Sequence, residues 1–171
     1  AGKILGRWAG KNLSSIGTAL TGILGVAHVA KSVMGDKLTT LTGKAVHTMS
    51  GGLVPVWTPS LPKPVTQKDI KTAKEYGAVN GLKGLRDNRV VYFPSCLNQR
   101  LSPPGKPLVN DVTELLNKAG FEVIFPAGME NLCCGTIWES KGMPEEADRK
   151  AAELELALLK ASEYGKWPVL C

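Results

Sequence analysis

The spacing of apolar and polar residues divides the chain into a helical first part and an alternating second part. Over residues 12–34, polar and small residues recur every three to four positions on one side, and apolar residues line the other. A second helix is predicted to begin at Asp36 and to end at the glycine pair 51–52. We therefore predict a helical segment over residues 1–52.

Residues 53–88 differ from the helical part in composition, since they are rich in proline and glycine. Residues 53–64 hold four prolines, which excludes a helix and predicts an extended strap. Residues 66–77 favour a short polar helix, and a glycine-containing basic loop leads to Arg89. Residues 53–88 are therefore interpreted as a linker rich in proline and glycine.

After residue 89 the pattern alternates between short apolar runs and longer amphipathic segments. Strands are predicted at residues 90–93, 122–125 and 168–171, and helices at 107–119 and 144–164. The inner face of the first of these helices is expected to contain Leu108, Val112, Leu115, Leu116 and Ala119. The order βαβαβ predicts an α/β domain with a small parallel sheet over residues 89–171, preceded by a helical, proline-strapped extension.

Charge is distributed unevenly along the chain. Residues 1–89 carry a net charge of +9, whereas residues 90–171 carry −3. The simplest interpretation is a solvated basic face; contact with anionic lipid headgroups or with an acidic partner domain are the alternatives. Aromatic residues are only 6% of the chain and do not alternate with the lysines, so we expect no nucleic-acid partner.

The four cysteines carry the strongest chemical signal. Cys96 follows the first predicted strand, Cys133 and Cys134 follow the second, and Cys171 ends the third. Because parallel strands end at one edge of their sheet, these thiols are expected to converge there. Soft thiolates gathered in this way suit an iron–sulfur cluster or zinc. Gly135 is expected to let backbone N–H groups point at the sulfur atoms.

Other interpretations of the cysteines stay open. A single cysteine is more often a small buried apolar residue than a ligand, and a disulfide is a further alternative. The metal hypothesis requires the sulfur atoms of Cys96 and Cys133 to lie within about 10 Å of each other, since a metal site cannot bridge a longer gap. Neither His28 nor His47 has a partner histidine nearby in the sequence, and both are interpreted as surface or core residues.

These residues resemble a known family. The spacing of Cys96, the Cys133-Cys134-Gly135 motif and Cys171 resembles the cysteine-rich CCG domain, with 36 residues in each interval. That domain occurs in heterodisulfide reductase subunits, in anaerobic glycerol-3-phosphate dehydrogenase and in lactate and glycolate oxidation proteins. The stretches VVYFPSCLNQR, AGFEVIFPAGMENLCCGTIWESKGMPEEAD and YGKWPVLC look closest to FAD-linked D-lactate dehydrogenases.

The resemblance implies a function. It implies that Cys96, Cys133 and Cys134 are metal ligands and that the domain holds a 4Fe-4S cluster or zinc. Cys171 has the spacing of the ligand that opens the closing CxxC motif; the alternative is a cysteine at the strand end just before that motif. It further implies a longer parent chain with FAD and ferredoxin-like domains, which oxidises a 2-hydroxy acid and passes electrons to a quinone or a cytochrome. Because the sequence begins at Ala1 and ends at Cys171, we interpret it as a piece of such a chain, without turnover of its own.

Two further hypotheses belong to other classes. In one, the domain is a scaffold that holds structural zinc, or no metal, and binds other domains. In the other, the N-terminal helices bind a lipid surface and the cysteines are incidental, since residues 16–34 contain one charged residue and are almost long enough to cross a bilayer. We expect a cytoplasmic protein, with peripheral contact at the inner face of the membrane.

Overall fold

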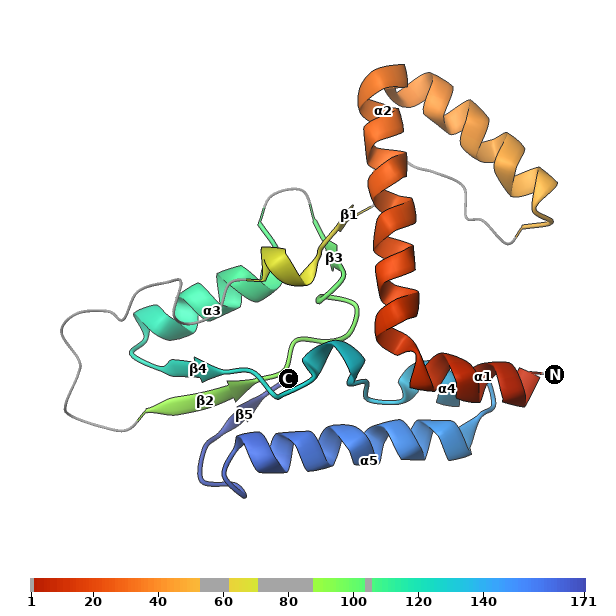
Figure 1. Ribbon diagram of the computed structural model, residues 1–171. Helices are drawn as coiled ribbons and strands as arrows, with labels where there is room; N and C mark the ends of the chain where they lie inside the picture. Colours follow the sequence, from red (N-terminus) through yellow and green to blue (C-terminus); the bar gives the residue numbers. More distant parts are fainter. Residues whose placement is uncertain (1, 53–61, 71–87, 104–105) are drawn as a thin grey trace.

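The computed structural model describes residues 2–52, 62–70, 88–103 and 106–171. A short N-terminal helix, a long kinked helix, a two-stranded ladder and a small helix-flanked parallel sheet are the main parts of these ranges (Figure 1). The helices are α1 (Gly2–Lys11), α2 (Leu13–Met49), η1 (Gln67–Asp69), α3 (Leu108–Lys118), η2 (Met129–Asn131), α4 (Thr136–Glu139) and α5 (Pro144–Ala161). The strands are β1 (Lys63–Pro64), β2 (Arg89–Tyr92), β3 (Leu101–Ser102), β4 (Glu122–Ile124) and β5 (Val169–Leu170).

The predicted α/β fold is confirmed. Strands β4, β2 and β5 form a three-stranded parallel sheet in that order, with Val90 beside Val123 and Val91 beside Val169. Helix α3 connects β2 to β4, and α5 leads into β5, on opposite sides of the sheet (Figure 1). The core combines the strand residues with side chains of both helices, among them Val109, Leu116 and Leu158. All three strands end at the same edge, as the βαβαβ order requires.

The inner face predicted for α3 is partly wrong. Leu108, Leu115 and Ala119 are exposed, whereas Val109 and Thr113 are buried. Thr113 tolerates burial because its hydroxyl donates a hydrogen bond of 2.7 Å to the carbonyl oxygen of Val109. The buried side is therefore rotated by one position from the side that leucine spacing indicates.

The two helices predicted before residue 52 form one long helix with a sharp break. Within α2, Gly35 has φ of 74°, which separates residues 13–34 from the part that begins at Asp36. Helix α1 was not predicted. The prolines at 62 and 64 are described, and Lys63–Pro64 pairs with β3 in an antiparallel ladder. The rest of the predicted strap, most of the helix at 66–77 and the basic loop lie outside the described residues.

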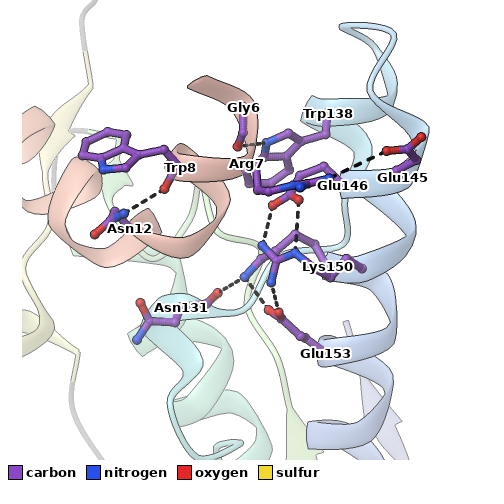
Figure 2. Close-up of polar contacts among 11 residues, drawn as sticks. Gly6, Arg7, Trp8, Asn12, Asn131, Trp138, Glu145, Glu146, Lys150 and Glu153 are labelled. Carbon is purple, nitrogen blue, oxygen red and sulfur yellow. Dashed lines mark hydrogen bonds and ion pairs between the residues drawn. The ribbon is translucent and has the colours of Figure 1, made fainter. Parts of the chain in front are cut away.

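Three glycines allow the N-terminal helices to lie close to the α/β domain, because a larger side chain would not fit at these positions. A Cβ atom on Gly6 would lie 2.2 Å from the sulfur of Met143, one on Gly10 would lie 1.8 Å from Glu146 Oε1, and one on Gly17 would lie 1.8 Å from Arg100 Cζ. The indole N–H of Trp138 donates to the carbonyl oxygen of Gly6 at 3.1 Å. Figure 2 shows this contact between α1 and the neighbouring helices.

Replacing Gly17 with alanine is expected to destabilise this contact. The new methyl group would displace the guanidinium of Arg100, which donates to the carbonyl oxygens of Leu13 and Glu130, so we expect a loss of about 1–2 kcal/mol in urea unfolding. The matched control is Gly22→Ala on the same helix, where a Cβ has nothing within 4 Å. Alanine there should be neutral or slightly stabilising. Equal effects of the two substitutions would contradict the packing described.

Candidate metal centre

Two of the four cysteines meet beyond the carboxyl edge of the sheet. The loop after β2 carries Cys96, and the loop after η2 carries Cys133, with a separation of 3.9 Å between their sulfur atoms. This is far inside the limit of about 10 Å that the metal hypothesis sets. It is also far longer than the roughly 2.05 Å of an S–S bond, so these two residues are not joined by a disulfide, and Cys134 is free as well.

The local chain explains why this pair is held in place. Cys133 is buried in a small apolar cluster with Trp138 and Ala147, against which Leu13, Cys96 and Met143 pack. Gly135 follows with φ of 92°, and its Cα lies so close to α5 that an added Cβ would be 2.5 Å from the carbonyl oxygen of Ala147. Only glycine fits this combination of a positive φ and a close backbone approach.

Backbone N–H groups point at both sulfur atoms. The N–H of Gly135 donates to the sulfur of Cys133, and the N–H of Leu97 donates to that of Cys96. The expected contact between Gly135 and sulfur is therefore present, while its role toward a cofactor stays a prediction. Such N–H donors stabilise negative charge on sulfur.

The contact between the two sulfur atoms moves their pKa values in opposite directions. The hydrogen bond from the thiol of Cys133 lowers the pKa of Cys96 to about 7, and the nearby positive charge of Arg100 acts in the same direction. The pKa of Cys133 is raised, because its proton is held in that hydrogen bond and because the side chain is buried. Lys150 opposes this rise by its charge. The half-buried Arg100 therefore acts on Cys96, and the buried Lys150 acts on Cys133.

The reactivity of Cys96 should reflect this arrangement. We expect its alkylation by iodoacetamide to increase with a midpoint near pH 7, below the ordinary value near 9, because the thiolate is the nucleophile. Cys133→Ala removes the donor that contributes most to the shift, so the midpoint should move upward. The measurement is the alkylation rate against pH, followed by mass spectrometry of the peptide that contains Cys96. An unchanged midpoint in Cys133→Ala would contradict the assigned hydrogen bond.

The other two cysteines lie at the same edge without joining the pair. Cys134 is exposed, and its sulfur lies 3.3 Å from the hydroxyl oxygen of Thr136. Cys171 is exposed and follows β5, where the N–H of Phe93 donates to the carbonyl oxygen of Leu170. Cys134 and Val169 of β5 line one open groove of about 430 Å³. Among the described residues, no group of three or more His, Cys, Asp or Glu side chains is arranged to hold a metal ion.

The sulfur pair nevertheless fits a soft metal in kind and in spacing. Two thiolates bound to one tetrahedral ion at about 2.3 Å would lie about 3.8 Å apart, close to the observed 3.9 Å. This distance accounts for two ligands, Cys96 and Cys133. A third from Cys134 would require its sulfur to turn away from Thr136, and the assignment of Cys171 stays a prediction.

The sequence analysis does not identify the two cations near the sulfur pair, Arg100 and Lys150. Arg100 was not singled out, although it lies four residues after Cys96, and its guanidinium connects the sulfur pair to α2. Lys150, which is almost fully buried, donates to the carbonyl oxygen of Asn131 and to Glu153 (Figure 2). Neither residue differs from an ordinary surface cation in the sequence, so only the three-dimensional structure identifies them.

Comparison with known proteins agrees with the cysteine pattern. Residues 90–165 match the family model described as CCG, a cysteine-rich domain. The matched region includes strands β2 (from Val90) and β4, helices α3 and α5 and three of the four cysteines, while β5 and Cys171 lie beyond it; it supports a CCG-type domain in this part of the chain. No curated protein and no solved structure matches the sequence.

Proposed function

We propose that the cysteine-rich part binds a metal through Cys96 and Cys133, with Cys134 and Cys171 as further ligands, and that it serves as an iron–sulfur electron-relay module. The observation that supports metal binding most is the 3.9 Å separation of the two sulfur atoms, one half-buried and one buried, and the match of residues 90–165 to a cysteine-rich family supports the iron–sulfur assignment. Backbone N–H donors and two cations would stabilise the negative charge that thiolate ligands bring. We also propose the division into residues 1–52, 53–88 and 89–171.

The finer part of the proposal concerns the reaction. An iron–sulfur cluster supplies one-electron transfer, and its potential depends on hydrogen bonds to sulfur, on burial and on nearby charge. Within this chain, Gly135 and Leu97 would donate to ligand sulfur, and Trp138 and Leu13 would limit the access of water. We propose a flavin-dependent dehydrogenase of a 2-hydroxy acid such as D-lactate as the parent system. Its flavin and ferredoxin-like domains and a quinone or cytochrome would be the partners.

A structural zinc site is the second candidate. It is favoured by one observation, the sulfur separation of 3.9 Å, which matches two ligands on a single tetrahedral ion. In that case the cysteine-rich part would be a scaffold for binding other domains.

Metal analysis of anaerobically purified protein separates these functions. The relay predicts iron with acid-labile sulfide and a broad visible absorbance that bleaches on reduction, whereas the scaffold predicts zinc without colour. Cys133→Ala should lower the metal content at least about tenfold in either case, because it removes the buried ligand. The control is Ile137→Ala, an exposed position four residues after Cys133. Metal that persists unchanged in Cys133→Ala would overturn both assignments.

A further inference from the structure

Helix α2 carries a large apolar surface that the described residues do not cover. We define its outer face as Leu20, Ile23, Val26, Val29, Val33 and Met34. The exposed fractions of Ile23, Val26 and Val33 are 65%, 72% and 80%. In Figure 1 this part of α2 stands away from the α/β domain. Continuous exposed apolar surface of this kind marks a binding site for a protein or a membrane.

The opposite side of the helix is the one that packs against the protein. There Gly17 and Thr21 are buried, Gly17 lies against Arg100, and a ring nitrogen of His28 lies 3.2 Å from the carbonyl oxygen of Pro62. The polar and small side therefore faces inward and the apolar side faces out, which is the reverse of an ordinary surface helix of a globular protein. The apolar side requires an apolar environment of its own.

The charges beside the outer face favour a lipid surface. Residues 1–68 contain one acidic residue, Asp36, which pairs with Lys31 at 3.2 Å. The exposed cation Lys11 lies before the outer face in the sequence, and the exposed cations Lys37 and Lys44 follow it. An apolar face bordered by lysines complements an anionic bilayer, whereas a second copy of this chain would bring the same positive charges together.

The geometry favours a helix that lies in the interface. By length and composition α2 is the one helix of the described residues that could cross a membrane, with a mean hydropathy of 1.5 over its most apolar window. Its first turns are held against the domain, which leaves residues 22–34, about 20 Å of helix, before the break at Gly35. A hydrocarbon core is about 30 Å thick. The part after the break again exposes apolar residues, including Leu41 and Met49.

We propose that α2 binds the surface of an anionic lipid bilayer, with its outer face in the interfacial layer and the cysteine-rich part in water. The test is flotation of the full chain with phosphatidylcholine vesicles, with and without phosphatidylglycerol. The wild-type protein should bind the anionic vesicles and lose binding as salt increases. Val29→Asp combined with Val33→Asp should lower partitioning roughly 100-fold, because two apolar contacts are replaced by charges that the surface repels.

Two further variants complete the experiment. Leu115→Asp, at an equally exposed leucine of α3, is the matched control and should bind as the wild type does. Lys37→Glu with Lys44→Glu should remove the preference for anionic over neutral vesicles. The proposal is overturned if the wild-type protein does not float, or if the double aspartate variant floats equally well. It is also overturned if sedimentation shows a dimer that this variant dissociates, since the outer face would then be a protein interface.

Discussion

Replacing Gly135 with alanine is expected to lower the free energy of unfolding by about 3 kcal/mol or more. Two costs combine: φ of 92° disfavours any residue with a Cβ, and that Cβ would lie 2.5 Å from the carbonyl oxygen of Ala147. The atom that it meets belongs to the backbone of α5, so neither side can give way without moving the helix or the cysteine loop. Urea unfolding followed by circular dichroism measures the loss.

The matched control separates the two costs. Gly142 also has a positive φ, 69°, but a Cβ there has nothing within 4 Å. Gly142→Ala should therefore cost only about 1 kcal/mol, from the backbone conformation alone. If both substitutions had the same small effect, the close approach between Gly135 and α5 would be wrong. In Gly135→Ala we also expect faster alkylation of Cys133, because the loop that buries it must shift.

The second large effect is expected at Lys150. Its side chain is only 3% exposed, and its ammonium group donates 2.8 Å and 2.7 Å hydrogen bonds to the carbonyl oxygen of Asn131 and to Glu153 (Figure 2). Lys150→Met keeps most of the apolar volume but leaves the carbonyl oxygen without this donor. We expect a loss of about 2–4 kcal/mol in the free energy of unfolding.

A lysine on the outside of the same helix provides the control. Lys160 is exposed near the end of α5, and Lys160→Met should change stability by less than about 0.5 kcal/mol. If Lys150→Met were equally silent, the hydrogen bond from Lys150 to Asn131 of η2 and its ion pair with Glu153 would not contribute to folding. Metal content measured on the same variant tests whether the charge of Lys150 supports the thiolate pair in addition to the fold.

The order of the sheet and the edge where the cysteines lie could be predicted because they depend on local patterns. Short apolar runs, proline at a helix start and glycine past a helix end define strands and helices over a few residues. The carboxyl edge then follows from parallel topology, which places Cys96 and Cys133 in neighbouring loops. The 3.9 Å distance between them depends on the exact path of both loops, and no spacing rule supplies it.

The features that the sequence does not predict depend on contacts between residues far apart in the chain. Helix α1 is short, and its sequence does not indicate that Gly6 and Gly10 pack against residues at the start of α5. The face predicted for α3 is partly wrong because Thr113, a polar residue, can be buried once its hydroxyl donates to the carbonyl oxygen of Val109. The sequence pattern predicts an apolar side of α2 that shares Leu20, Ile23 and Met34 with the outer face, but it does not include the exposed valines and does not indicate that this side faces outward.

Metal K-edge X-ray absorption on the full chain, purified without oxygen, tests the central claim most directly. The account predicts that the bound metal has sulfur neighbours at about 2.3 Å, and that Cys96→Ala and Cys133→Ala each reduce this sulfur signal. A metal surrounded only by nitrogen and oxygen, or a sulfur signal unchanged in both variants, would contradict a thiolate centre at Cys96 and Cys133.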